Sequence, residues 1–584
     1  MIELHWNEAV YAEETAALRM LQIDGGTLVI GSDFSSASRT VSRIVEARRS
    51  GELVALYPML ADPLETAVEQ VCGAIGAQTD PGAKFTQLLA LRDNRLRVNE
   101  RALSEAAQYD ARTLAAAILA VKLADVLLFF TAAEKERWST MLGRPVRRYA
   151  YLPVPSVHPA CTAQNGIAVY APHCSQARLA FVALALAERR MPANVVCAEN
   201  SAAALNAGTV IVPSWWRPAR AASLARAGYR VVTPSAGAPD DRCACTTYPA
   251  LDAFALPAAV DAAQSGGCAP RFDVTADWTL HAIRAARCAI DRGPRVSVIV
   301  RTYDRPQLLA RALRSIVAQT YADVEIVVVN NGGEEVHSIV EEACKPRPFR
   351  YRRLPQRMHI SAASNAGARA ASGTYIAYLD DDDLLYPDHL SRAVEALERS
   401  GADLAYTNCV AEYARMNGAD KHVLGFQIFR DAEFVAMDLY VDNVAPIHSI
   451  VHRRELFDRA GYFDEDLPVT DDWEMWLRAA RGARFIHVDR VTCEYSWRHD
   501  PAKGNMTLTH QRHFAESYEK ITSRYAGDLT CFPNVTALQA QVKAAQKQRA
   551  EQLLQLGPRL PELTISAMAQ NAVAAEPPPN DPFA

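Results

Sequence analysis

The stretch from residue 294 to 333, PRVSVIVRTYDRPQLLARALRSIVAQTYADVEIVVVNNGG, constrains the fold more than any other part of the chain. VSVIV and VEIVVVNN are continuous apolar, largely β-branched runs, which are typical of parallel strands buried on both faces. Between them, apolar residues recur at helical spacing, and Pro306 stands at a favourable first helical position. The pattern predicts a βαβ unit of an α/β domain. It places residues 301–305 and 330–333 at the carboxyl ends of adjacent strands, where open α/β sheets bind ligands.

A third strand of this sheet ends in an acidic cluster. TYIAYL is the predicted strand, four aspartates (380–383) follow it directly, and YPDHLSRAVEALERSG then predicts an amphipathic helix that ends at Gly401. Taken alone, the acidic run has two interpretations of similar weight. It could cap the helix and complement its dipole, or it could hold a divalent cation through carboxylate oxygens.

Composition and missing motifs exclude several other classes of protein. The chain has 584 residues, 22% of them charged, with a net charge of -5, so it lacks the basic footprint of a nucleic-acid-binding protein. Neither G-x-G-x-x-G nor a P-loop sequence follows the first strand, which disfavours dinucleotide-binding and P-loop folds. The amino terminus lacks the layout of a signal peptide and the cysteines are scattered, so we expect a cytoplasmic protein with free thiols.

The first 265 residues alternate apolar strands with helical segments, which predicts two Rossmann-like α/β domains, at 1–157 and 158–268. Within the second, GTVIVPSWWRPARAASLARAGYRVVTPSAGAPD resembles the donor-side half of a GT-B glycosyltransferase of the family 4 type. Arg217 and Ser223 stand where that family has acidic residues, so we interpret the region as a non-catalytic module. We further expect a helical connector at 269–293, a carboxyl-terminal helix at 531–556 and a disordered tail at 557–584.

Four segments in register resemble glycosyltransferase family 2, the inverting enzymes of GT-A fold. They are VSVIVRTYDRP, QTYADVEIVVVNNGG, SNAGARAASGTYIAYLDDDDLLYP and RRELFDRAGYFDEDLPVTDDWEMWLR. The similarity runs from about residue 294 to 525, and we place the catalytic domain at 294–530. It implies a mixed, mainly parallel sheet and a nucleotide diphosphate sugar as the donor.

The resemblance also implies roles for individual residues. Tyr303 stands where the family stacks the nucleotide base. Asn331 replaces the family's usual aspartate, which leaves the identity of the nucleotide open. The family's metal ligands correspond to Asp382 and His499, which would bind Mn²⁺ or Mg²⁺, while we expect Asp383 to begin the next helix. The predicted donor-binding residues are Arg301, Thr302, Tyr303, Arg305, Asn331, Arg357, Asn365, Asp380, Asp381 and Arg498.

LPVTDDWEMWLR carries the general base of the family, which corresponds to Asp472. One carboxylate on the acceptor side must take the hydroxyl proton during in-line attack. A capping box of Asp471 and Glu474 is the structural alternative, and both can hold at once. His448 could line the acceptor site or simply be a half-buried, hydrogen-bonded histidine.

The sequence therefore predicts a metal-dependent inverting glycosyltransferase that acts on a surface glycan, a lipid-linked sugar or a protein, as in polysaccharide biosynthesis. We expect it in the cytoplasm, with peripheral attachment to the inner face of the membrane as an alternative, and without a nucleic-acid partner. Two rival functions stay open. One is a regulator that binds nucleotide sugars without turnover, and the other is a bifunctional transferase. The oligomeric state is left open.

Overall fold

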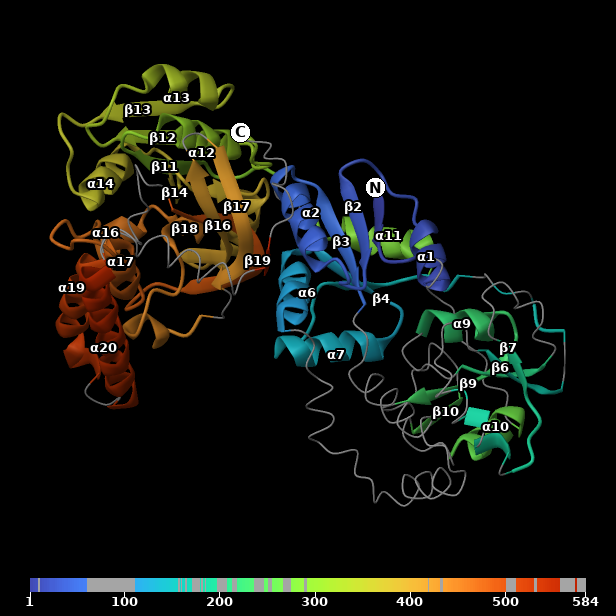
Figure 1. Cartoon of the computed structure of the whole chain (residues 1–584). Coiled ribbons are helices and arrows are strands. Elements are labelled where there is room, and N and C mark those ends of the chain that lie inside the picture. The colour runs from blue at the N-terminus through green and yellow to red at the C-terminus, as the bar shows by residue number, and fades with distance from the viewer. Residues whose placement is uncertain are drawn as a thin grey trace. The chain divides into compact units, whose positions relative to one another are not determined.

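The computed structural model forms two compact units, residues 1–40 with 53–286 and residues 41–52 with 287–584 (Figure 1). The break at 286/287 falls inside the predicted connector, whereas the assignment of 41–52 to the second unit has no counterpart in the sequence prediction. The structure describes residues 1–8, 11–59, 111–155, 158, 160–162, 165–170, 179, 182–183, 185–187, 189–196, 207–212, 218–235, 246–249, 255–265, 275–287, 291–417, 420–430, 434–499, 511–529, 533–556 and 573–574.

The first unit contains two five-stranded parallel sheets, in the orders β1-β2-β3-β4-β5 and β10-β9-β8-β6-β7. Its elements are β1 (Ile2–His5), α1 (Ala12–Arg19), β2 (Thr27–Ser32), α2 (Ala37–Arg49), β3 (Leu53–Pro58), α6 (Ala111–Leu123), β4 (Val126–Phe129), α7 (Ala132–Leu142), β5 (Tyr149–Tyr151), β6 (Ile167–Tyr170), β7 (Asn194–Val196), β8 (Thr209–Ile211), α9 (Pro218–Arg226), β9 (Arg230–Ser235), β10 (Thr246–Pro249), α10 (Leu256–Ser265) and α11 (Ala276–Arg284).

These sheets confirm the predicted parallel α/β architecture of the amino-terminal region. The second sheet has the doubly wound order 2-1-3-4-5, which reverses between β6 and β8, while the first shows no reversal among its described strands. Ser223, at one of the positions where a GT-B donor site would have an acid, is completely buried. Arg217, at the other, lies outside the described residues.

The second unit is built on a mixed sheet in the order β13-β12-β11-β14-β18-β16-β17-β20, with β19 beside β16 and β15. Its elements are β11 (Val296–Thr302), α12 (Pro306–Val317), β12 (Val324–Asn330), α13 (His337–Cys344), β13 (Phe349–Arg353), α14 (Ile360–Ala370), β14 (Tyr375–Asp380), β15 (Leu384–Leu385), α15 (His389–Ser400), β16 (Leu404–Asn417), β17 (Asp420–Arg430), η3 (Asp438–Tyr440), η4 (Ile447–Ser449), β18 (Ile450–Arg453), α16 (Leu456–Ala460), α17 (Asp471–Ala479), β19 (Phe485–His499), α19 (Gln511–Arg524), η5 (Ala526–Leu529), α20 (Pro533–Leu556) and β20 (Val573–Ala574).

The central strand β11 is buried on both faces, as its sequence predicts. Val298 and Val300 point into a core that includes Leu309 of α12, while Ile299 points into a second core with Trp476 of α17. Pro306 begins α12, and Gly401 ends α15 in the left-handed conformation, with φ of 64°. Successive side chains of a strand alternate between faces, so the apolar run supplies both cores.

Residues 41–52 bring a buried cation into the second unit. Arg49 Nε donates to Glu494 Oε1 at 2.8 Å, and Arg49 Nη2 donates to Glu412 Oε2 at 2.6 Å. The three side chains are 1–3% exposed. Lys421 also pairs with Glu412. The buried carboxylates are thus compensated by cations from distant parts of the sequence.

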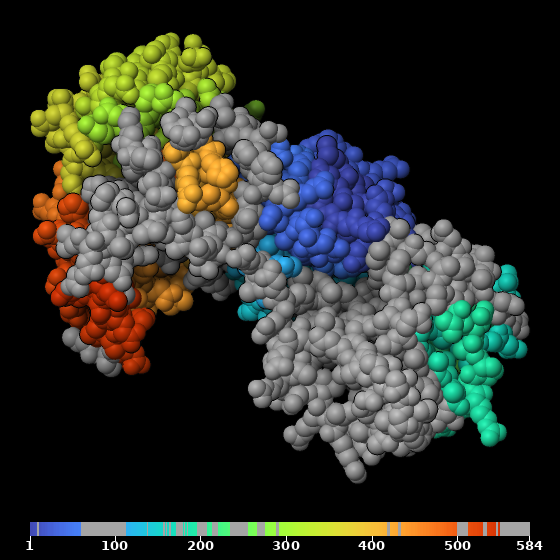
Figure 2. All heavy atoms as spheres, in the orientation of Figure 1, coloured from blue at the N-terminus to red at the C-terminus, as the bar shows by residue number. Residues whose placement is uncertain are grey.

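The carboxyl-terminal helices α19 and α20 pack on each other and form part of the surface of the second unit (Figure 2). Two residues of the predicted disordered tail form β20, which pairs antiparallel with β17, and the rest of the tail lies outside the described residues. In the part of the chain that the structure describes, no helix is long and apolar enough to cross a bilayer.

Candidate active site

Three parallel strands end at one edge of the large sheet and bring the predicted donor-binding residues together. In the register of the sheet, Arg301 of β11 lies beside Asp380 of β14, and Thr302 lies beside Asn330 of β12. Arg301 donates to Asp380 Oδ1 from Nη2 at 2.5 Å and from Nε at 2.9 Å, and its Nη1 donates to Ser364 Oγ at 3.0 Å. The strand ends therefore join through a charge-assisted pair.

The next two aspartates meet the first loop and β19. Asp381 accepts a hydrogen bond from Thr302 Oγ1 at 2.8 Å and from Arg305 Nη1 at 3.1 Å. Burial raises the pKa of Asp381 to about 6, and the adjacent Asp382 charge adds to the rise although Arg305 opposes it. Asp382 pairs with Arg305 at 3.3 Å and with Arg498. Burial disfavours its ionised form, but the two arginines outweigh burial and lower the pKa of Asp382.

Arg498 has unused hydrogen-bonding capacity next to the acidic loop. Its side chain is 1% exposed and Nη1 is engaged by Asp382. Its Nε and Nη2 have no acceptor among the residues that the structure describes. A buried guanidinium with free N–H groups favours an anionic ligand, and a phosphate group matches its planar geometry.

Asp383 does not begin the following helix, so that prediction is wrong. α15 begins at His389, and Asp388 holds the N-cap position. Asp383 is instead buried, accepts from the Ser496 backbone N–H at 2.8 Å, and lies 2.9 Å from His448 Nδ1 through its other oxygen. Burial raises the pKa of Asp383 to about 7, although the nearby His448 opposes the rise. His448 is itself only 1% exposed, so it cannot line an open acceptor site.

The predicted base stands at the start of α17. Thr470 has φ of 59°, a left-handed conformation that turns the chain into the helix. Asp472 Oδ1 accepts from its neighbour Trp473 N at 2.8 Å, and Oδ2 accepts from Asn443 Nδ2 at 2.8 Å. Burial, and then the charge of Asp471, raises the pKa of Asp472 to about 7. This value suits a general base near neutral pH.

The capping box predicted beside the base is wrong. Thr470, and not Asp471, occupies the N-cap position, and no side chain there makes a capping hydrogen bond. Glu474 points elsewhere, because it accepts from Tyr525 Oη at 2.6 Å and pairs with Arg478 at 2.8 Å. The left-handed Thr470 turns the chain away from the geometry of a capping box.

Arg301 links the donor-side acid to the predicted base. The charges of Asp380, Asp471 and Asp472 all act on its guanidinium and raise the pKa of Arg301, although burial opposes the rise. The charges at the end of β14 and at the start of α17 therefore act on the same guanidinium.

The loop after β12 lies against the segment that precedes α14 at Gly332. With φ of 79°, this residue approaches the next loop so closely that a Cβ would lie 2.2 Å from the Gln356 carbonyl carbon. The close approach brings Arg357 over the Tyr303 ring, 4.4 Å from its centroid. These two predicted donor-binding residues therefore form a cation–π stack.

Two predicted donor contacts are engaged with the protein itself. Asn331 exchanges two 2.9 Å hydrogen bonds with the Met358 backbone. Asn365 is 2% exposed and donates to Phe463 O at 2.9 Å and to Glu465 Oε1 at 2.8 Å. Asn365 thus holds a loop in place and has no free polar atom for a donor. The side chain of His499, the last residue of β19, lies outside the described residues.

Comparisons with known proteins identify the class. The profile of Glycosyl transferase family 2 matches residues 297–459. The glycosyltransferase YwdF of Bacillus subtilis is 33% identical over 201 residues, which cover 34% of this chain and 72% of YwdF. The succinoglycan biosynthesis protein ExoO of Rhizobium meliloti is 27% identical over 255 residues, covering 41% of this chain and 71% of ExoO.

Among solved structures, the mannosyltransferase PcManGT from Pyrobaculum calidifontis in complex with GDP-Man and Mn²⁺ is similar, with 19% identity and a TM-score of 0.32 over 48% of this chain and 85% of that one. S. aureus TarS 1-349 in complex with UDP-GlcNAc has 17% identity and a TM-score of 0.31, covering 41% and 73%. The second unit of this chain carries the family 2 domain that the profile matches. The chain belongs to glycosyl transferase family 2 and is a glycosyltransferase.

Proposed function

We propose that the chain transfers a sugar from a nucleotide diphosphate sugar to an acceptor hydroxyl with inversion of configuration. The observation that carries this proposal is the position of Asp472. Its carboxyl has a pKa of about 7, and its charge acts on Arg301, which pairs with Asp380 of the acidic loop. Base and donor-side acid thus belong to one charged site, as a single in-line displacement requires.

The donor lies along the strand ends. Tyr303 and Arg357 offer a planar stack for the base. Arg305 and the Nε and Nη2 groups of Arg498, which have no acceptor among the described residues, bind the diphosphate. The Asn331 contact with the base stays a prediction, because its amide must first leave the Met358 backbone.

The donor set of the acidic loop fits a divalent cation of the kind that the family implies. Asp382 carries carboxylate oxygens, and its side chain is 11% exposed. Oxygen ligands of this type suit Mg²⁺ and Mn²⁺. When bound there, the ion stabilises the negative charge that develops on the departing diphosphate. His499 as a further ligand stays a prediction.

Asp472 takes the proton of the acceptor hydroxyl. Trp473 N and Asn443 Nδ2 each hold one carboxylate oxygen, so the group is oriented before the acceptor arrives. Their hydrogen bonds favour the ionised form and limit the rise in pKa. Removal of the proton makes the acceptor oxygen nucleophilic, and attack opposite the leaving group inverts the anomeric centre.

The acceptor is a growing surface glycan, a lipid-linked sugar or a protein. The first is favoured because ExoO is a succinoglycan biosynthesis protein. Such a reaction takes place in the cytoplasm or at the inner face of the membrane, with the GT-B-like first unit as a recognition module. A regulator without turnover is disfavoured by Asp382 and Asp472. A bifunctional transferase is disfavoured by the burial of Ser223.

Calorimetry of UDP, GDP and dTDP, each with and without Mn²⁺, tests the donor half of the proposal. We expect one nucleotide to bind in a Mn²⁺-dependent manner, and Asp382→Asn to abolish that dependence. The matched control is Asp323→Asn, because Asp323 is an exposed acid that pairs with Arg295 before the amino ends of β11 and β12. If no nucleotide binds, or if Asp382→Asn retains full metal-dependent transfer, the proposal is wrong.

A further inference from the structure

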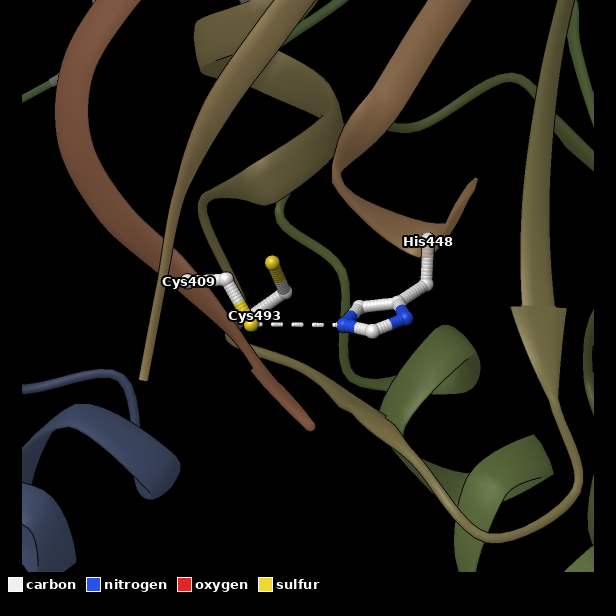
Figure 3. A group of neighbouring side chains, drawn as sticks. All are labelled: Cys409, His448 and Cys493. Carbon is white, nitrogen blue, oxygen red and sulfur yellow. Dashed lines mark hydrogen bonds between the residues drawn. The ribbon is translucent and has the colours of Figure 1, made fainter. Parts of the chain in front are cut away.

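Two cysteines and a histidine from separate segments converge inside the second unit (Figure 3). Cys409 lies on β16, Cys493 lies opposite it on the neighbouring strand β19, and His448 lies in η4. The donor atoms all lie within 4.8 Å of one another. Each of the three residues is at most 1% exposed. The proposed transfer reaction uses none of them.

The distances suit a tetrahedral metal centre. Zn–S bonds of about 2.3 Å and Zn–N bonds of about 2.0 Å place a sulfur and a nitrogen ligand about 3.5 Å apart. Cys409 Sγ lies 3.4 Å from His448 Nε2. Three protein ligands are assigned, and Thr407 Oγ1 lies beside them, 3.9 Å from Cys493 Sγ. Two thiolates and an imidazole form a set that selects zinc over magnesium or manganese.

The histidine is held in the orientation that a metal ligand needs. Asp383 Oδ2 lies 2.9 Å from His448 Nδ1. At this distance the carboxylate favours a proton on Nδ1, which leaves Nε2, 3.4 Å from Cys409 Sγ, as the ligand atom. Ser496 N donates to the other oxygen of Asp383 and fixes the carboxylate in turn. Metal-bound histidines commonly have such an outer carboxylate partner.

We propose that Cys409, His448 and Cys493 bind a structural Zn²⁺ ion, with Asp383 as the outer partner of the histidine. The ion joins β16, β19 and η4 below the acidic loop. Asp383 directly follows Asp382, so zinc fixes the loop that binds the donor. The site is separate from the Mn²⁺ or Mg²⁺ position in its ligands and in its chemistry.

Metal analysis and cobalt substitution of the full chain test this site. We expect about one zinc per chain after purification with a phosphine reductant, and a thiolate-to-cobalt charge-transfer band when Co²⁺ is added to chelator-treated protein. Oxygen ligands do not give this band, so the donor-site cation cannot imitate it. Absence of both retained zinc and the cobalt band would overturn the proposal, as would a Cys409–Cys493 disulfide in the purified protein.

Variants locate the ligands. Cys409→Ser and Cys493→Ser should lose the cobalt band. The matched control is Cys344→Ser, because Cys344 is a free, completely buried cysteine of the same unit outside the cluster. Asp383→Asn should weaken zinc binding about 10- to 100-fold. Asp382→Asn should keep the band, which separates this site from the proposed transfer site. Retention of the band in both ligand variants would overturn the assignment. If they do not fold, the wild-type titration decides.

Discussion

Replacement of Asp472 by asparagine should abolish catalysis while it stabilises the fold. The amide keeps one oxygen for Trp473 N, and the Asn443 amide can turn to offer its oxygen to the new NH₂ group in exchange for its long 3.4 Å contact with Ala445 N. The geometry of the helix start is thus preserved and only the proton acceptor is lost. General-base catalysis typically contributes about 10²- to 10⁴-fold, so we expect kcat to fall by that factor with donor affinity unchanged.

The stability effect follows from the raised pKa. A shift from 3.8 to about 7 corresponds to about 4 kcal/mol of cost for the ionised carboxylate. Solvent at this partly exposed side chain reduces the cost to about 2 kcal/mol. Because the folded-state pKa lies above the unfolded value, the folded protein binds more protons between about pH 4 and 7, and its stability falls as the pH rises through that window. Asp472→Asn should therefore unfold several degrees higher at pH 8 and match the wild type near pH 4.

Two assays separate these effects. Initial rates from pH 5 to 9 should show wild-type kcat/KM falling about tenfold per pH unit below pH 7, which is the acid limb of the rate profile. The residual kcat/KM of the variant should not fall in this way. Thermal unfolding at pH 4 and pH 8 gives the stability difference, with Asp323→Asn as the control for loss of an exposed carboxylate. Near wild-type turnover, or an acid limb that persists in the variant, would refute the role of Asp472.

Three further predictions concern the neighbours of this site. Asn443→Ala removes a hydrogen bond to the ionised Asp472, so the acid limb of the rate profile should move to higher pH; an unmoved limb would contradict this. Gly332→Ala should lower the free energy of unfolding by at least about 1 kcal/mol in thermal unfolding, because its φ is left-handed and the new Cβ would clash with the Gln356 backbone. The variant should also have a higher KM for the donor. Wild-type stability would contradict the predicted clash. Arg498→Met removes a cation that lowers the pKa of Asp382. The ionised Asp382 stabilises the folded protein above the unfolded-state pKa of this aspartate, so urea unfolding at pH 7 should show a less stable variant. At low pH, where Asp382 is protonated in the folded and unfolded protein, the difference in stability should disappear.

The architecture of the catalytic half could be read from the sequence because its signals are local. Buried parallel strands require uninterrupted apolar residues, and Pro306 and Gly401 mark helix ends by their backbone preferences. The acidic loop and Asp472 could be singled out from the sequence because each belongs to a recognisable segment, and their roles stay predictions. The assignment of residues 41–52 to the second unit was not predictable, because no sequence pattern in α2 indicates it.

The partners within the site depend on tertiary contacts that no local pattern records. Asp383 stands in a run of identical residues, so the sequence does not distinguish it from Asp381 and Asp382. In the fold, Asp383 contacts His448, 65 residues away, whereas Asp381 and Asp382 pair with arginines. Asn443 carries no motif at all, yet it orients the predicted base. The helix-cap expectations failed for the same reason, since long-range partners outweighed local hydrogen bonds.

The burial of Arg49 limits where the catalytic unit can be cut. A shortened chain that starts at residue 294 contains the whole family match, but it leaves Glu494 buried without the guanidinium that engages both of its oxygens. Breaking a buried ion pair by removal of one partner typically costs about 3–5 kcal/mol, a large share of the 5–15 kcal/mol that holds a typical protein folded. The minimal enzyme is therefore discontinuous in sequence, and a transferase trimmed to its family boundaries should be recovered largely as aggregate unless Glu494 is also neutralised.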